Sequence, residues 1–245
     1  MEHPVTNLKY CARSESGPVR PLNEDCYAIG EGSADAPPGQ LFVVCDGRGG
    51  PNVGDVAARL AADTIIATYY AAEDIDPTQA LLKAFQTANE QIYHQWSRSS
   101  TRVTATAALA IGAQLVIANA GDCRAYHFHA RQLEQITTDH TFYSTLIQDG
   151  MLTRKDVQMY TSGIARLLAL GNEVDLEADV FQQTLQPGDA ALLCTDGLHD
   201  YMEDEEIQEI LTTVPREKTV DRFIELVTER GGRDNVTAVL IWREI

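Results

Sequence analysis

The chain has 245 residues, of which 44% are hydrophobic and 22% charged, and this is enough to bury a sizeable core in one domain or two. Its formal net charge of −17 argues against nucleic acid or an anionic membrane as a partner, because both would repel it. No apolar stretch approaches the roughly 20 residues that span a bilayer, and residues 1–15 lack the apolar segment of a signal peptide.

The N-terminal part of the chain predicts two strands followed by two helices. Apolar runs at 26–30 and 41–45 are typical of strands, and a loop rich in glycine and proline separates them. Apolar residues at a helical period predict helices over 53–70 and 78–96. The run 41–45 leads into an Asp-Gly pair that is followed by a helix, so this pair is not the turn of a hairpin.

The middle of the chain changes to strands joined by short turns, which indicates antiparallel pairing. These strands are expected at 103–111, 114–122, 123–129 and 132–137. Residues 139–166 have only short helical stretches and are expected to form an inserted, mobile flap. The pattern then predicts two strands, a pair of helices and a final strand, at 176–185, 189–195, 203–212, 218–229 and 235–242.

This order of elements predicts a layered α+β fold in which helices cover a core of two antiparallel sheets. The five cysteines are widely spaced and include no C-x-x-C pair, so neither a zinc site nor a disulfide framework is expected. A reducing, cytoplasmic location is the simplest interpretation of these thiols.

Five aspartates share one local pattern: each lies at the end or edge of a predicted strand, near glycine or asparagine. They are Asp25, Asp46, Asp122, Asp196 and Asp234. Taken singly, each is better explained as a turn residue. Taken together, they would place four or five carboxylates in one pocket, where mutual repulsion raises their pKa values unless a cation neutralises them. Mg²⁺ and Mn²⁺ suit such an all-oxygen site, and a glycine after the aspartate would let an ion approach the main-chain carbonyl.

Two such ions would hold a bridging water as hydroxide and direct it at phosphorus. The phosphate oxygens then require a cation that grips two of them in one plane, which is a role for arginine rather than lysine. Arg20, five residues before Asp25, is the candidate, although on its own it would be interpreted as a solvated loop residue.

These residues belong to a longer series of motifs. In chain order they are "GPVRPLNED", "VVCDGRGG", "NAGDCRAY", "PGDAALLCTDGLHDY" and "GGRDNVTAVLI". The series resembles that of the metal-dependent Ser/Thr protein phosphatases, the type 2C or PPM family, in its compact bacterial form, over residues 14–242. The resemblance implies one domain over 1–245: an antiparallel β-sandwich of two sheets flanked by helix pairs in four layers, αββα, with the flap at 139–166.

The resemblance also implies an activity. The chain would hydrolyse phosphoserine and phosphothreonine on proteins by direct attack of a hydroxide that bridges two Mn²⁺ or Mg²⁺ ions. It would act in signalling as a cytoplasmic monomer that opposes a Ser/Thr kinase, with no nucleic acid or membrane as a partner. Asp46, Asp196 and Asp234 would ligate the first ion, and Asp46 with the Gly47 carbonyl the second.

Further roles follow from the same resemblance. Asp25 would hold metal-bound water with the help of Glu24, and Asp122 with Asp196 would form a third, weaker metal site. Arg20 would bind the substrate phosphate. Asn235 would orient the loop around Asp234 rather than touch an ion.

The chain departs from the family pattern beside the metal loop. Arg48 replaces a methionine, and Pro51 replaces a histidine that is the family's favoured candidate for protonating the leaving group. Three possibilities follow: a metal-bound water protonates the leaving group, His199 or His140 does so, or turnover is slower. Arg48 would be available to bind phosphate or an acidic segment of the substrate. His199 is better interpreted as structural.

Other departures indicate packing. Arg102 and Val103 occupy the positions where the family has Met-Gly. Cys123 replaces a serine of the family, and its thiol is expected to be either simply buried or sensitive to oxidation. His127 and His129 share one face of a strand, a spacing that can bind a metal but is more typical of a half-exposed hairpin.

Two alternatives remain open at the level of sequence. The departures at Arg48 and Pro51 would fit a weak or inactive pseudophosphatase that binds phosphoproteins, although no expected metal carboxylate is missing. A phosphomonoesterase for small molecules would share the same site and differ only in substrate preference.

Overall fold

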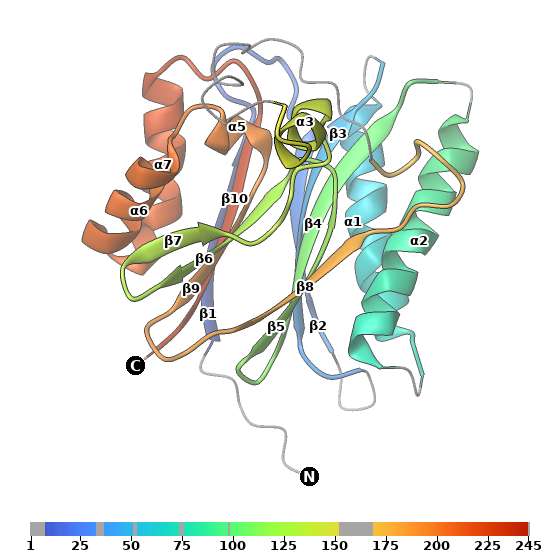
Figure 1. The fold of residues 1–245 in the computed structure, drawn as a ribbon. Coiled ribbons are helices and arrows are strands. Elements are labelled where there is room, and N and C mark those ends of the chain that lie inside the picture. Colours follow the sequence, from blue (N-terminus) through green and yellow to red (C-terminus); the bar gives the residue numbers. More distant parts are fainter. Residues whose placement is uncertain are drawn as a thin grey trace.

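The structure is a computed structural model that describes residues 8–32, 37–50, 53–73, 76–97, 99–151 and 169–244. It contains two five-stranded antiparallel sheets packed face to face, each with a pair of helices on its outer side (Figure 1). The predicted α+β fold with four layers is therefore confirmed. Pro51 and the part of the predicted flap at 152–166 lie outside the described residues.

The first sheet has the strand order β2-β3-β4-β5-β8 and is covered by α1 and α2. Residues 41–45 of β3 are buried on both faces, because the sheet has α1 on one side and the second sheet on the other. The side chain of Asp76 accepts hydrogen bonds from the backbone N–H groups of Thr78 and Gln79, which caps α2 at its start. The elements are β2 (Asp25–Glu31), β3 (Gln40–Arg48), β4 (Arg102–Ile111), β5 (Gln114–Ala120), β8 (Asp179–Thr184), α1 (Gly54–Tyr70) and α2 (Pro77–Trp96).

The second sheet has the strand order β1-β10-β9-β6-β7 and is covered by α6 and α7. Two short helices, α3 and α5, lie near the upper end of the sandwich in Figure 1. The elements are β1 (Leu8–Glu15), β6 (Arg124–His129), β7 (Gln132–Gln135), β9 (Ala190–Cys194), β10 (Val236–Arg243), α3 (Phe142–Gln148), α5 (Asp196–His199), α6 (Asp204–Thr213) and α7 (Arg216–Glu229).

Three hydrophobic clusters hold the layers together. The central cluster lies between the sheets and includes Phe42 and Ile117 from one sheet with Leu193 and Ile241 from the other. One outer cluster joins the first sheet to α1 and α2, and the other joins the second sheet to α6 and α7. Burial on both faces of both sheets fixes the strand register, because a slip of one residue would turn apolar side chains away from their partners.

Two strands differ from the sequence prediction, and the short helix α5 was not predicted. The strand β1 was not predicted, because it is an edge strand with no fully buried residue and no clean alternation of apolar side chains. The strand β3 does not end at Asp46 but continues through the Asp-Gly pair to Arg48, where it still pairs with β4. In the part of the chain that the structure describes, none of the helices has both the length and the apolar character needed to cross a bilayer.

Candidate metal centre

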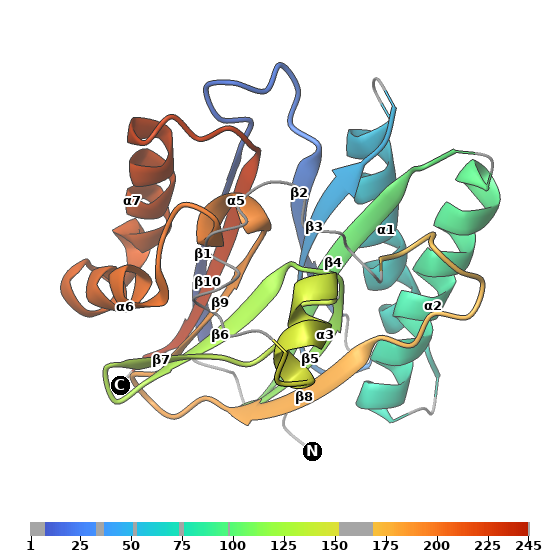
Figure 2. The ribbon, with the colours of Figure 1, turned by 45° about the horizontal axis from the view of Figure 1, so that its top comes forward.

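The five aspartates singled out in the sequence lie at one end of the sandwich. Asp25 begins β2 and is directly opposite Asp46 in the register of β2 with β3. Asp122 lies in the turn between β5 and β6, Asp196 begins α5 directly after β9, and Asp234 precedes β10. Figure 2 looks onto this end, where β2, β3, β10 and α5 surround one region. The antiparallel pairing thus brings together positions that are far apart in the sequence.

Three of these carboxylates form a compact group. Oxygen atoms of Asp46, Asp122 and Asp196 all lie within 4.8 Å of one another. Asp122 is buried, and the other two are partly buried. Three carboxylates this close repel one another unless a cation lies between them, and carboxylate oxygens are the ligands that Mg²⁺ and Mn²⁺ prefer. The donor set therefore fits a divalent metal ion.

Asp25 lies behind this group and is buried. The Thr195 hydroxyl donates a hydrogen bond of 2.7 Å to its carboxylate, and Thr195 in turn is held by backbone contacts with Thr237. Burial and the neighbouring Asp46 carboxylate raise the pKa of Asp25 well above its ordinary range, although hydrogen bonds from Thr195 and Thr237 oppose the shift. Thr195 was not recognised from the sequence, where its only signal is its place directly before Asp196.

The glycines of the two Asp-Gly pairs, Gly47 and Gly197, are needed for the same structural reason. A Cβ atom on Gly47 would overlap the backbone carbonyl of Gly54 at the start of α1. A Cβ atom on Gly197 would overlap the carbonyl oxygen of Asn235 beside β10. Each glycine thus allows two backbones to approach closely, and this packing fixes the aspartate that precedes it.

Arg20 reaches this end of the sandwich from the loop before β2. Its Nη2 atom donates to a carboxylate oxygen of Asp234 at 2.9 Å, and its Nε atom donates to the carbonyl of Arg233 at 3.0 Å. Both side chains of the ion pair are about half exposed. The guanidinium group predicted to bind phosphate therefore lies directly beside a carboxylate predicted to bind metal.

Asn235 connects the loop before β10 to the N-terminal loop. Its amide nitrogen donates to the carbonyls of Ser16 and Leu22, and its amide oxygen accepts from the backbone N–H of Glu24. The Glu24 carbonyl in turn accepts a hydrogen bond of 3.0 Å from the N–H of Gly47. These contacts place Asn235 as a structural link between the segments that carry Glu24 and Asp234.

The comparisons with known proteins identify the family. The family model described as "Protein phosphatase 2C" matches residues 17–146. The serine/threonine phosphatase stp of Listeria monocytogenes serotype 4b is 31% identical over an alignment of 244 positions, which covers 95% of this chain and 95% of that one. The chain belongs to the protein phosphatase 2C family.

Relatives with solved structures extend the likeness to the whole fold. The crystal structure of the Mycobacterium tuberculosis serine/threonine phosphatase PstP is 32% identical, covers 97% of this chain and 99% of that chain, and has a TM-score of 0.84. Stp1 from Staphylococcus aureus is 31% identical, covers 97% and 96% of the two chains, and has a TM-score of 0.87. The catalytic domain of PstP has also been solved in complex with two manganese ions, with a TM-score of 0.82 and 32% identity.

In this member of the protein phosphatase 2C family, both candidate histidines hold the turn that carries Asp122. The Nε2 atom of His199 donates to the backbone carbonyl of Asp122 at 3.0 Å, and only 5% of its side chain is exposed. The Nδ1 atom of His140 accepts from the N–H of Gly121 at 3.1 Å, while its Nε2 atom lies 3.0 Å from a carboxylate oxygen of Asp179. These contacts favour the structural interpretation of His199 and extend it to His140.

Arg124 and Asp139 form a largely buried ion pair beside the same turn, with 21% and 14% of their side chains exposed, which the sequence did not reveal. Three nitrogen–oxygen distances of 2.7 to 3.1 Å join the guanidinium group to the carboxylate. Burial opposes ionisation of Asp139, but the charge and hydrogen bonds of Arg124 outweigh it and lower the pKa of Asp139. The available signal was the arginine two residues after Asp122 in "GDCR".

The remaining departures from the family pattern lie around the carboxylates. Arg48 is exposed at the end of β3, directly opposite Arg102 in the register with β4. The Cys123 thiol is buried 3.2 Å from the hydroxyl of Thr104. Burial and then the Asp46 carboxylate raise the pKa of Cys123, which favours an unreactive thiol because only the thiolate is the nucleophile.

Proposed function

We propose that this chain is a metal-dependent protein phosphatase that hydrolyses phosphoserine and phosphothreonine. The observation that carries the proposal is the group of three carboxylates, Asp46, Asp122 and Asp196, within 4.8 Å of one another at the end of a protein phosphatase 2C fold. Two Mn²⁺ or Mg²⁺ ions at these oxygens would activate water and neutralise charge on the phosphate.

The arrangement of the aspartates supports a different role in metal binding for each of them. Asp46, Asp196 and Asp234 would bind the first ion, and Asp46 with the Gly47 carbonyl would bind the second. Asp122 with Asp196 would hold a third, weaker ion. Asp25, with Glu24, would contact the ions through water, and its burial behind Asp46 supports this indirect role.

Arg20 would bind the phosphate of the substrate. Its contacts with Asp234 and the Arg233 carbonyl place the guanidinium group at the edge of the carboxylate group. A planar guanidinium can donate to two phosphate oxygens at once, which orients the phosphate as well as neutralising it. Exposed Arg48 would add a second contact with the phosphate or with an acidic segment of the substrate.

The pseudophosphatase is not favoured, because all five aspartates occupy one end of the fold and three of them form a compact group. With His199 and His140 both engaged in holding the turn around Asp122, a water molecule is the better candidate for protonating the leaving group. Pro51 lies outside the described residues and adds nothing to this choice.

The wider role follows from the chemistry of the substrate. A phosphatase acting on phosphoserine and phosphothreonine must oppose a Ser/Thr kinase, and this chain would do so as a monomer with a single phosphatase domain over residues 1–245. Its five cysteines carry free thiols, which supports the proposal of a reducing, cytoplasmic location.

The direct test is release of phosphate from a phosphothreonine peptide by the purified protein, with Mn²⁺ and then with EDTA. Turnover that requires Mn²⁺ is expected. A panel of phosphorylated metabolites at the same concentrations separates the protein phosphatase from a phosphomonoesterase for small molecules. A higher kcat/KM on a metabolite than on the peptide would overturn the assignment of protein substrates.

A further inference from the structure

A second group of potential metal ligands lies at the opposite end of the second sheet. It consists of His127 and His129 on β6 and Asp189, which directly precedes β9. One ligand atom from each of the three residues lies within 4.8 Å of the other two. The protein phosphatase chemistry described above uses none of these residues.

The distances match the requirements of a small divalent ion. The Nε2 atom of His127 lies 3.3 Å from one oxygen of Asp189, and the Nδ1 atom of His129 lies 2.8 Å from the other. Ligands bound to Zn²⁺ at about 2.0–2.1 Å with tetrahedral geometry are roughly 3.3 Å apart. Two imidazoles and a carboxylate with one open position are a ligand set that zinc sites use. Small side-chain adjustments would therefore create the site.

The surroundings fix two of the three ligands. Only 11% of the His127 side chain and 5% of the Asp189 side chain are exposed. The hairpin of β6 and β7 expected from the sequence is present, but of its two histidines only His129 is exposed. The backbone N–H of Gln186 donates to the Asp189 carboxylate at 2.8 Å, which orients it toward the histidines. Such outer contacts orient metal ligands and increase affinity.

His129 provides access from solvent. Its side chain is 58% exposed, and its ring stacks on that of His127 with centroids 5.7 Å apart. His129 and Asp189 line a cavity of about 410 Å³, which leaves room for water at the open position of an ion. The turn after His129 places Ala130 and Arg131 at positive φ angles of 49° and 65°, which strains the backbone of these non-glycine residues. This tight turn fixes the pairing of β6 with β7, and the pairing in turn fixes the position of His129.

Arg216 lies at the same cavity and places a positive charge there. Its guanidinium group stacks on Phe128, 4.7 Å from the ring centroid, and is attracted by the charge of Asp189. This positive charge lowers the affinity of every divalent cation, so the ligands decide between ions. Imidazole ligands favour Zn²⁺ over Mg²⁺, which prefers oxygen ligands and gives up its water reluctantly.

This group is separate from the carboxylates of the candidate catalytic centre. Asp189 precedes β9 and Asp196 follows it, so the two lie at opposite ends of the same strand, about 23 Å apart for seven extended residues. We propose that His127, His129 and Asp189 form a binding site for Zn²⁺ or a similar imidazole-preferring divalent ion, which ties the hairpin of β6 and β7 to the start of β9.

The test is calorimetric titration of the full chain with Zn²⁺ in a large excess of Mg²⁺, in the parent protein and three variants. His129→Ala removes an exposed ligand and should leave the fold intact. His127→Gln removes the buried ligand with a side chain of similar size. His94→Ala, which removes an exposed histidine from α2, is the matched control. Phosphatase activity with Mn²⁺ verifies that each variant is folded.

One equivalent of Zn²⁺ is expected to bind the parent protein and the His94→Ala variant with equal affinity. The His129→Ala and His127→Gln variants should bind this Zn²⁺ ion about a hundredfold or more weakly than the parent protein, while they retain phosphatase activity. The proposal is overturned if folded His129→Ala binds as many Zn²⁺ ions, as tightly, as the parent protein.

Discussion

At the scale of single residues, the candidate metal centre combines carboxylates that repel one another with glycines whose close backbone packing holds these carboxylates in place. The overlap of a Cβ on Gly197 with the Asn235 carbonyl shows that the site depends on close backbone packing as much as on its acids. Asn235 also holds Glu24 and the loop before β2. A change at this glycine should therefore affect both stability and metal binding.

Gly197→Ala should destabilise the folded protein. Because the added methyl group meets backbone rather than a flexible side chain, we expect a loss of about 1–3 kcal/mol in the free energy of unfolding, measured with urea. Gly50→Ala is the control, since a Cβ there meets nothing within 4 Å. Equal stability of the two variants would contradict this interpretation of the Asp-Gly pair.

Asp25→Asn should separate folding from metal binding. Burial and the Asp46 carboxylate raise the pKa of Asp25, so the folded protein binds a proton here more tightly than the unfolded chain does. Without metal, stability should therefore fall as pH rises from the ordinary carboxyl pKa of about 3.9 toward the raised value.

The neutral amide introduced by Asp25→Asn escapes this loss, so in EDTA at neutral pH the variant should be more stable than the parent protein. Added Mn²⁺ should stabilise it less than it stabilises the parent. Thermal unfolding of both proteins with EDTA and with Mn²⁺ measures both effects. A variant less stable than the parent in EDTA would show that the Thr195 hydrogen bond outweighs the repulsion.

Arg20→Lys tests the proposed phosphate contact. Lysine keeps the charge but cannot donate two parallel hydrogen bonds to phosphate, so KM should rise about ten- to a hundredfold while metal-dependent turnover remains. Arg222→Lys, on the exposed face of α7, is the control. Unchanged steady-state kinetics for Arg20→Lys would remove Arg20 from the substrate site.

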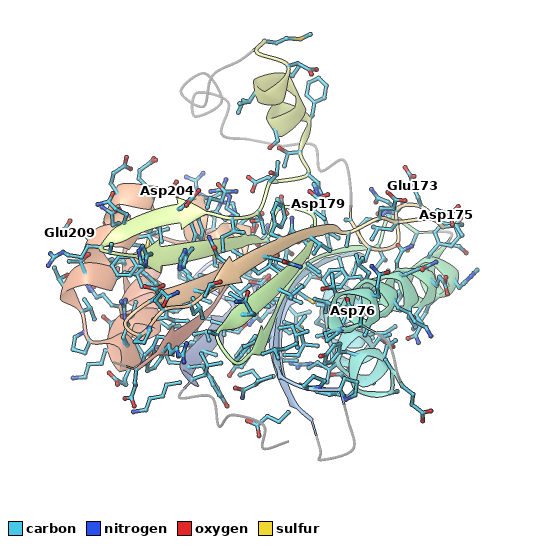
Figure 3. The ribbon with its side chains drawn as sticks, turned by 60° about the horizontal axis from the view of Figure 1, so that its bottom comes forward. Asp76, Glu173, Asp175, Asp179, Asp204 and Glu209 are labelled. Carbon is cyan, nitrogen blue, oxygen red and sulfur yellow. The ribbon has the colours of Figure 1, made fainter. Side chains whose placement is uncertain are left out.

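At the scale of elements, the turn between β5 and β6 is the best supported part of the centre. His140 and His199 contact its backbone, and the ion pair of Arg124 with Asp139 anchors the start of β6 to the segment before α3. The short helix α3 projects away from the sheets, whereas Asp179, which contacts His140, lies at the start of β8 (Figure 3). Asp122 is thus fixed from several sides.

Arg124→Gln should destabilise the fold strongly, because it leaves the largely buried Asp139 carboxylate without its charged partner and with Gln135 as its remaining side-chain donor in the described part of the chain. We expect a loss of about 3–5 kcal/mol in the free energy of unfolding at neutral pH. Because Arg124 lowers the pKa of Asp139, the stability that the pair contributes is present above the ordinary carboxyl pKa of about 3.9 and is lost as pH falls through the lowered value.

Urea unfolding at several pH values checks both statements. Arg222→Gln, which removes an exposed ion pair with Glu225, should cost less than about 1 kcal/mol. A similar small loss for Arg124→Gln would mean that the ion pair with Asp139 does not anchor the turn.

At the scale of the whole molecule, the fold class was predictable because the periods of apolar residues differ between strands and helices. The strand β1 escaped prediction because an edge strand with exposed side chains carries little apolar signal. The set of acids was predictable from the motifs. The hydrogen bond of Thr195 with Asp25 was not, because it joins residues 170 positions apart whose pairing depends on how the two sheets pack. The contact of His127 with Asp189 escaped because it joins residues 62 positions apart, which only the pairing of β6 with β9 in the second sheet brings together.

The central claim is that the gathered carboxylates hold metal ions for phosphate hydrolysis. The most direct measurement is Mn²⁺-dependent phosphate release from a phosphothreonine peptide by Asp196→Asn and by Asp175→Asn. The two variants carry the same chemical change, but Asp175 is an exposed surface residue (Figure 3) and is not part of the group of three carboxylates. We expect Asp175→Asn to match the parent protein and Asp196→Asn to lose a hundredfold or more in kcat, because each metal ion supplies several kcal/mol of transition-state stabilisation. Parent-like turnover by a folded Asp196→Asn variant would contradict the account.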